Sequence, residues 1–137
     1  MLRQISIFTE NRKGAMRSIT RLLAEGGIDI DAFVTNDSAE FGIVRMLVSD
    51  PDRASELLTA AGYQIKRTPV MAFEIPDEPG SLDRLLACIE DANINIDYLY
   101  ASFDRASAGP VIIIRAEDMD ELERFLKSRG FRCKQAK

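Results

Sequence analysis

The sequence contains one internal repeat, and each of its two copies takes up about half of the chain. The matching residues are glycines, apolar residues and an aspartate, and all of them recur at the same spacing. The matched pairs are Gly14 and Gly80, Met16 and Leu82, Ile28 and Ile94, Ile30 and Ile96, and Asp31 and Asp97. A repeat this long in a chain of 137 residues indicates duplication of a small domain rather than a solenoid. We therefore expect two similar units, residues 1–68 and residues 69–137.

Each of these units is small for a protein domain. A domain of about 60 residues buries only about 60% of the surface that its unfolded chain exposes, so it is marginally stable alone. We expect the two units to depend on each other and on a second chain. The boundary falls near Thr68 and Pro69, and no Gly/Ser-rich linker separates the units. This predicts rigid docking rather than free movement.

The composition is typical of a folded globular protein, with 46% hydrophobic and 29% charged residues. A net charge of −4 repels phosphate backbones, so we expect no nucleic-acid partner. The first residues lack the apolar core of a signal peptide, and no apolar run approaches the 18 or so residues of a membrane span. The sequence thus predicts a cytoplasmic protein without a membrane partner. Two cysteines fit a reducing compartment, and we expect Cys88 to be a buried, unreactive core residue.

The chain contains no histidine, and this narrows the chemistry that it can perform. Mechanisms that use a histidine base, such as the Ser-His-Asp and Cys-His arrangements, are excluded. Without histidine or closely spaced cysteine pairs, we expect no metal site. No phosphate-binding or dinucleotide glycine pattern is present, so we expect no cofactor. An enzyme is therefore the least supported class of function.

Hydrophobic periodicity and turn residues predict the same order of elements in both units: strand, helix, strand, strand, helix, strand. The first helix of each unit should end at residues that tolerate left-handed backbone, Gly26-Gly27 in one unit and Ala92-Asn93 in the other. In the first unit the predicted strands are 2–8, 28–34, 41–48 and 63–65, with helices over 16–26 and 51–61. In the second unit they are 70–75, 94–103, 111–115 and 131–133, with helices over 82–91 and 119–129.

This order of elements is the ferredoxin-like plan, an α+β fold in which two helices cover one face of an antiparallel four-stranded sheet. Such a sheet needs apolar residues only at alternate positions. However, residues 43–48 and 111–114 are apolar on both faces, apart from Arg45. By strand alternation, Phe33 and Leu99 should also point away from the face of Ile30 and Ile96. We therefore expect the second face to be covered by the other unit and by a symmetric partner, which predicts a homodimer.

The turn between the first strand and the first helix of each unit is the chemically distinctive feature. A helix N-terminus presents free backbone N–H groups and the positive end of the helix dipole. Gly14 and Gly80 would let a ligand approach those groups without a side chain in the way. Carboxylates stand beside both turns, Glu10 in one and Asp77 and Glu78 in the other. Such a turn could hold the carboxylate and ammonium of a free amino acid, but the same residues also fit an ordinary turn.

At this point the sequence resembles a known family. Asp77-x-Pro79-Gly80-x-Leu82, the segment Ala92-Asn93-Ile94-Asn95-Ile96 and the order of elements are similar to an ACT domain. The ACT family comprises small regulatory modules that bind amino acids and act with enzymes of amino-acid metabolism. The resemblance covers essentially the whole chain twice, as in stand-alone tandem ACT proteins. The first unit departs from the pattern, because Lys13 stands where the family usually has proline.

The resemblance also implies where a ligand would sit. In ACT domains, ligands commonly lie between paired units, against the turn after the first strand and the neighbouring second strand. The positions that match are Asn11, Lys13, Gly14, Ala15, Met16 and Asp31 in the first unit, and Asp77, Glu78, Pro79, Gly80, Ser81, Leu82, Asn95, Asp97 and Tyr98 in the second. Lys13, Asp31 and Asp97 could equally be solvated surface residues, and Tyr98 a packing residue.

Two functions follow from this resemblance. The first is a non-catalytic regulatory protein that binds a free amino acid and modulates amino-acid metabolism, since the two units leave no sequence for a catalytic domain. The alternative is a subunit that binds no ligand and assembles with an amino-acid biosynthetic enzyme, as the small regulatory subunit of acetolactate synthase does. Calorimetry with free amino acids would separate the two, because the second predicts no heat of binding.

Overall fold

The computed structural model describes residues 1–10, 12–37, 41–103 and 106–134. Contacts divide the chain into two compact units. One consists of Arg3–Thr68 and is called the N-terminal unit below. The other consists of Pro69–Lys137 together with Met1–Leu2 and is called the C-terminal unit. Each unit is described by itself.

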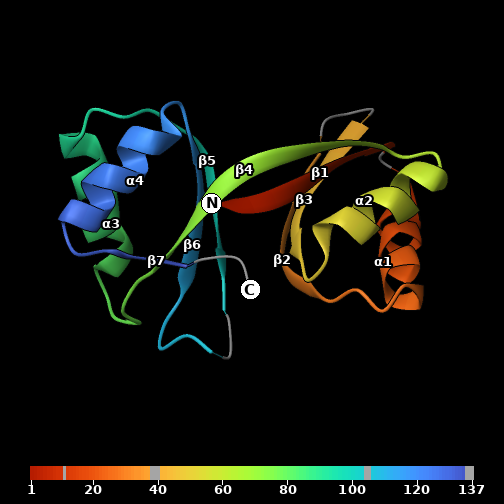
Figure 1. Cartoon of the computed structure of the whole chain (residues 1–137), viewed down its shortest axis with the longest axis horizontal. Helices are drawn as coiled ribbons and strands as arrows, with labels where there is room; N and C mark the ends of the chain where they lie inside the picture. Colours follow the sequence, from red (N-terminus) through yellow and green to blue (C-terminus); the bar gives the residue numbers. More distant parts are fainter. Residues whose placement is uncertain (11, 38–40, 104–105, 135–137) are drawn as a thin grey trace. The chain divides into compact units, whose positions relative to one another are not determined.

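The N-terminal unit has the strand order β2-β3-β1-β4. Strand β3 pairs antiparallel with both β1 and β2. Figure 1 shows α1 and α2 together on one side of these strands. The elements are β1 (Leu2–Glu10), α1 (Ala15–Glu25), β2 (Ile30–Asp37), β3 (Phe41–Val48), α2 (Pro51–Ala60) and the first part of β4 (Gln64–Glu74).

The C-terminal unit repeats this arrangement, with β7 and β6 on either side of β4 and with β5 beyond β6. All of these pairings are antiparallel. In Figure 1, α3 and α4 lie together on one side of β4, β5 and β6. The elements after β4 are α3 (Ser81–Asp91), β5 (Ile96–Ser102), β6 (Val111–Ala116), α4 (Met119–Ser128) and β7 (Arg132–Lys134). The predicted fold, α+β with two ferredoxin-like units, is confirmed.

Strand β4 differs from the prediction, because it is one unbroken strand where the sequence indicated two. Residues before Thr68 belong to the N-terminal unit and residues after Pro69 to the C-terminal unit. The Thr-Pro pair was expected only as the boundary between the two units, and a residue before proline prefers extended backbone. The carbonyl oxygen of Pro69 accepts a hydrogen bond of 2.8 Å from Arg115 Nη1.

Each unit has its own hydrophobic core between the helices and one face of its sheet. In the N-terminal unit, Ile19 and Leu23 of α1 are fully buried against Ile5 and Ile7 of β1 and against Met46 of β3. The C-terminal core has the same plan and consists mainly of Phe73, Leu85, Ile89, Ile112, Ile114, Leu122 and Leu126. The helical residues of this core, Leu85 and Ile89 of α3 and Leu122 and Leu126 of α4, are spaced four apart and lie on the sheet side of their helices.

The central strands are also buried on the face that the helices do not cover. Ala72 and Ile113 alternate with the core residues and are 1% and 0% exposed. In the N-terminal unit, Gln4 and Ser6 are buried on that face too. The apolar run of β6, residues 111–114, is buried on both faces, whereas Ile43 of β3 is half-buried. The homodimer stays a prediction.

Three side chains lie elsewhere than the sequence pattern predicted. Phe33 pairs with Met46, a core residue, and Leu99 packs against the C-terminal core together with Ile96. Both therefore lie on the face of Ile30 and Ile96, because each strand contains a β-bulge that shifts the alternation by one residue. Leu82 is one of the periodic apolar residues of the predicted helix over 82–91, but it is 41% exposed.

Cys88 was expected to be buried, but it is half-buried at the edge of the C-terminal core, as is Cys133. No helix in the described part of the chain is long and apolar enough to cross a membrane.

Candidate functional site

The turns that precede α1 and α3 have the same backbone conformation. Gly14 has φ 83° and Gly80 has φ 89°, and each is the N-cap residue of its helix. A residue with a side chain is strained at such angles, so both turns depend on glycine. The residue that precedes each of these two helices therefore has no side chain.

The helices that follow these turns differ in capping from the other two. Asp50 and Asp118 each accept a hydrogen bond of 3.1 Å from a first-turn backbone N–H, that of Arg53 in α2 and that of Glu121 in α4. Among the described residues, no side chain caps α1 or α3.

The first N–H group of each helix is bonded to a turn carbonyl, Ala15 N to Arg12 O at 3.2 Å and Ser81 N to Glu78 O at 3.3 Å. The next two N–H groups of each helix are left for water or for a ligand, and the helix dipole favours an anion there.

At the C-terminal turn, two charged side chains meet beside Gly80. Arg84 Nη2 lies 2.6 Å from Glu78 Oε1 and donates a further hydrogen bond of 3.2 Å to Ser81 Oγ. Arg84 Nη1 would lie 3.4 Å from a Cβ placed on Gly80, so the guanidinium stands over the turn. Arg84 is not among the residues that the sequence predicted for this site. Its spacing of four residues from Gly80, about one helical turn, could have placed it above the helix start.

The same turn is supported by the end of the hairpin between β5 and β6. Ile75 N donates to Pro110 O at 3.0 Å, and Ala108 N donates to Glu74 Oε1 at 2.7 Å. Gly109 packs so closely that a Cβ there would lie 2.2 Å from Ile75 O. These contacts fix the strand end from which the turn starts.

The N-terminal turn carries different charges. Arg12 and Ser18 stand at the repeat positions of Glu78 and Arg84. Arg12 lies 3.8 Å from Glu10, and both side chains are highly exposed. Ser18 Oγ donates a hydrogen bond of 3.1 Å to Gly14 O. A Cβ on Gly14 would have no described atom within 4 Å. The N-terminal turn is therefore more open and more positively charged.

The residues proposed from the resemblance form two groups in the structure. The first group lies at the turns. Lys13, Gly14, Asp77, Glu78, Pro79, Gly80 and Leu82 are exposed, Ala15 and Met16 are half-buried, and Ser81 is 4% exposed. Asn11 lies outside the described residues.

The second group lies at the opposite end of the sheet. Asp31 follows Ile30, which pairs with Val48, whereas the turn follows Glu10, which pairs with Phe41. Strand β3 spans the distance between these ends with 8 residues, or roughly 23 Å. Asn95, Asp97 and Tyr98 likewise lie at the Ala116 end of β6, while the Gly80 turn lies at the Val111 end. Within one unit, the two groups cannot contact the same amino acid.

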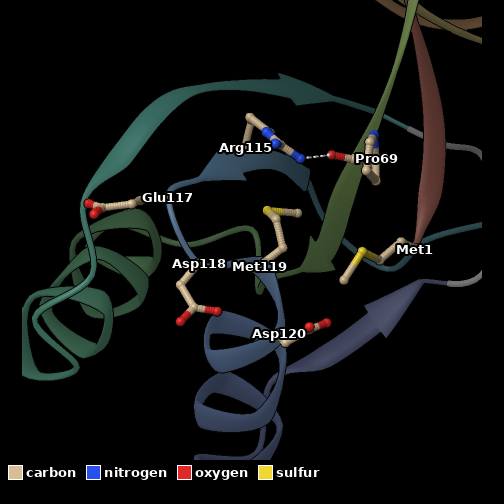
Figure 2. Close-up of a pocket in the computed structure, with 7 residues that line it drawn as sticks. All are labelled: Met1, Pro69, Arg115, Glu117, Asp118, Met119 and Asp120. Atoms are coloured by element: carbon tan, nitrogen blue, oxygen red, sulfur yellow. Dashed lines mark hydrogen bonds between the residues drawn. The ribbon is translucent and has the colours of Figure 1, made fainter.

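A wide, open pocket of ≈ 580 Å³ lies at the Asp97 end of the C-terminal unit. Its lining residues are Met1, Pro69, Arg115, Glu117, Asp118, Met119 and Asp120. Figure 2 shows the three carboxylates pointing in different directions, while Arg115 bonds to the backbone of Pro69. Asp118 is already used as the cap of α4. In the described part of the chain, no group of His, Cys, Asp or Glu residues is arranged to hold a metal ion.

The comparison with protein-family models identifies one family. The sequence model of the family described as "ACT domain pair" matches residues 1–129. Protein BT0572 from Bacteroides thetaiotaomicron is 30% identical, with a TM-score of 0.91 over 98% of this chain and 92% of that one. The ligand-free regulatory subunit of aspartate kinase from Thermus thermophilus is 18% identical, with a TM-score of 0.65 over 93% and 92%. No curated protein matches the chain.

Proposed function

The chain belongs to the ACT domain family as an ACT domain pair, and from this premise we propose that it is a non-catalytic regulatory protein that binds a free amino acid at its glycine turns. The amino acid would signal metabolite supply, and the protein would pass that signal to an enzyme of amino-acid metabolism. The regulatory subunit of aspartate kinase, which shares the fold, illustrates such a role in another protein.

One observation supports this function most directly. The chain caps α2 and α4 with aspartates but starts α1 and α3 with glycines. A glycine N-cap costs only about a few tenths of a kcal/mol relative to an aspartate, but it leaves backbone N–H groups without a side-chain partner at the same place of both units. The uncapped N–H groups suit the carboxylate of an amino acid. Glu78 and Asp77 offer acceptors for its ammonium beside the Gly80 turn.

The residues at the far end of each sheet have a separate place in this proposal. In a homodimer, Asp31, Asn95, Asp97 and Tyr98 could contact an amino acid that is bound at the turn of the partner chain. The length of the sheet excludes their contact with the turn of their own unit. We propose the homodimer on this ground and on the exposure of Phe33, which is 58% exposed on the edge strand β2.

A thermal-shift screen of the whole chain against each of the twenty free L-amino acids tests the proposal. At 100 times its Kd, an amino acid should stabilise the protein by about 2.7 kcal/mol. Isothermal calorimetry of the positive amino acids then gives affinity and stoichiometry. If none of the twenty changes the melting temperature or releases heat, the proposal fails. The chain would then fit the alternative, a regulatory subunit that assembles with an enzyme without binding an amino acid.

A further inference from the structure

We propose that copies of this chain associate through unlike helices, with the basic face of α1 in one copy against the acidic face of α3 in the other. The basic face is defined by Lys13 and Arg17, and the acidic face by Asp83 and Glu90. This inference rests on the homodimer of the proposed function and specifies which surfaces meet in it. It does not depend on whether an amino acid binds.

The first argument is a reversal of charge at one position of the repeat. Arg17 in α1 and Asp83 in α3 occupy the same repeat position, and both side chains are exposed. In the described part of the chain, neither has an ion-pair partner. Figure 1 shows α1 and α3 each on one side of the strands of their own unit. Two helices with the same place in the fold therefore present opposite charges to the surroundings.

A second charged residue extends each of these faces. Lys13 lies four residues before Arg17, and Glu90 lies seven residues after Asp83. Spacings of about one and two helical turns place such residues on one side of a helix. Lys13 and Glu90 are also exposed, and neither has an ion-pair partner among the described residues. The charge is thus a property of each face rather than of one side chain.

Each helix also carries a charge of the opposite sign, but that charge already has a partner in its own unit. Glu25 Oε1 lies 4.0 Å from Arg21 Nε at the end of α1. Arg84 Nη2 lies 2.6 Å from Glu78 Oε1 at the start of α3. The charges left for another molecule are therefore positive on α1 and negative on α3.

The second argument is the apolar surface beside the unpaired charges. Leu82, which precedes Asp83, is 41% exposed. Leu86 lies one helical turn further along α3 and is half-buried. At the repeat position of Leu82, Met16 precedes Arg17 and is half-buried as well. Apolar contact of this kind supplies affinity at protein interfaces, while the charges around it select the partner.

The signs of the charges decide which helices are able to meet. A contact of α1 with α1 of another copy would bring cations against cations, and a contact of α3 with α3 would bring carboxylates against carboxylates. Only α1 against α3 of the other copy places opposite charges together, so the arrangement selects unlike helices. Because the charges are exposed, salt should weaken the association.

The test reverses the charge of one face at a time. In the acidic double variant, Lys13→Glu and Arg17→Glu make α1 as acidic as α3. In the basic double variant, Asp83→Lys and Glu90→Lys make α3 as basic as α1. Sedimentation velocity of the whole chain at micromolar concentration compares the wild type, each double variant and their equimolar mixture, in 0.1 M and 1 M NaCl.

A matched control changes the net charge without changing either face. Arg53→Asp with Lys66→Glu removes two exposed cations of the N-terminal unit, one on α2 and one on β4. Its net charge equals that of the acidic double variant. This control should associate as the wild type does.

The wild type should sediment as a species larger than one chain of 15.3 kDa, and 1 M NaCl should weaken this association. Each double variant alone should associate about tenfold more weakly or less still, because its two helices now carry the same sign. The equimolar mixture should recover the larger species, since the acidic α1 of one variant meets the basic α3 of the other. A variant that combines all four substitutions should also recover it.

The outcomes separate this contact from the wider function. A mixture that remains at the size of the single chain, or a control that is as weak as the acidic double variant, would show that the contact is wrong. A wild type that sediments only as the single chain would overturn both the contact and the homodimer. Amino-acid binding is decided separately by the thermal-shift screen. Circular dichroism checks the fold, and Arg17→Glu and Asp83→Lys are mixed in the same way if a double variant does not fold.

Discussion

Asp31 and Asp97 are the inserted residues of two β-bulges that occupy the same position of the repeat. Ile30 pairs with Val48 while Ala32 pairs with the next residue, Leu47, so Asp31 is inserted between them. The register of β5 shifts in the same way around Asp97. An inserted residue reverses the alternation that follows it, and this brings Phe33 and Leu99 to the helix-covered face. The duplication thus preserved a structural irregularity as well as the regular elements.

The two aspartate caps allow a direct test of the capping contrast. Asp50→Ala and Asp118→Ala each remove an acceptor that lies 3.1 Å from a first-turn backbone N–H. Each substitution should lower the free energy of unfolding by about 1 kcal/mol, measured by urea denaturation. Asp120→Ala removes a first-turn acid that is not a cap. It should lower the free energy of unfolding by only about a few tenths of a kcal/mol. Equal losses for Asp118→Ala and Asp120→Ala would contradict the role of the cap.

Much of the fold could be predicted because local signals and the global plan agree. Asn93 was expected at a left-handed helix end and has φ 56°. The repeated order of strands and helices follows from hydrophobic periodicity, which reports the buried side of each element. The glycines of the two turns were also identified from sequence, since few other residues allow so close an approach to the backbone. In these cases a single residue or a short pattern determines the structure.

The remaining features depend on contacts between residues that are distant in the sequence, and a local sequence pattern does not reveal such contacts. Strand β4 continues through Pro69, whose carbonyl oxygen accepts a hydrogen bond from Arg115, and the Thr-Pro pair alone does not reveal this contact. No characteristic residue type marks the β-bulge at Asp97 in the sequence. A strict alternation of side chains that ignores this bulge assigns Leu99 to the wrong face of the sheet. Arg84 was missed because its role depends on where Glu78 folds back beside Gly80. The cytoplasmic location, the domain limits and the site residues stay predictions.

Gly109 should be intolerant of any side chain. In Gly109→Ala the new Cβ would lie 2.2 Å from Ile75 O, which is backbone and cannot move aside cheaply. We expect a loss of about 1–3 kcal/mol in the free energy of unfolding, as for other overpacked sites. Gly26→Ala is the control, because the one close approach of its Cβ would be to the flexible end of the Leu57 side chain, with Leu22 O and Ile28 at ordinary contact distance. The prediction fails if chemical denaturation finds Gly26→Ala the more destabilised of the two.

Cys133 should react slowly with alkylating reagents at neutral pH. Burial raises the pKa of its thiol, and Lys127 opposes this effect only in part. Because the thiolate is the reactive form, the alkylation rate of a Cys88→Ser variant should rise at higher pH than that of a free cysteine. The raised pKa means that the neutral thiol is favoured in the folded state. Its contribution to stability is therefore full at neutral pH and is lost as the pH rises through the folded-state pKa. A rate profile identical to that of the urea-unfolded variant would refute this.

Phe33 should contribute to the interface of the proposed homodimer. It is 58% exposed on β2, which is an edge strand of the N-terminal unit, and edge strands readily pair with a second chain. Sedimentation at micromolar concentration should show a species larger than one chain of 15.3 kDa. Phe33→Asp should shift it to the monomer. Phe103→Asp, at a residue that is 77% exposed beyond the end of β5, should not. A wild-type protein that sediments only as the single chain would overturn the proposal.

The glycines of the turns should separate stability from binding. In Gly80→Val a β-branched side chain is forced to a φ near 89°, and left-handed backbone costs such a residue about 1–2 kcal/mol. Gly14→Val meets the same strain at φ 83°. Gly130→Val is the matched control, because Gly130 has φ 90° but follows the end of α4 instead of starting a helix. Urea denaturation should therefore show similar losses of stability for all three variants.

The loss of binding affinity, unlike the loss of stability, should differ among the three variants. In Gly80→Val the added methyl groups cover the N–H groups of α3 and push against Arg84, which lies within 3.4 Å of the new Cβ. Calorimetry with the amino acid that gives the largest thermal shift should show a loss of affinity well beyond that of Gly130→Val. Gly14→Val should have the smaller effect, since its turn lacks a counterpart of Arg84. If both turn variants bind as tightly as Gly130→Val, the amino acid binds elsewhere, and the two glycines serve only to start their helices.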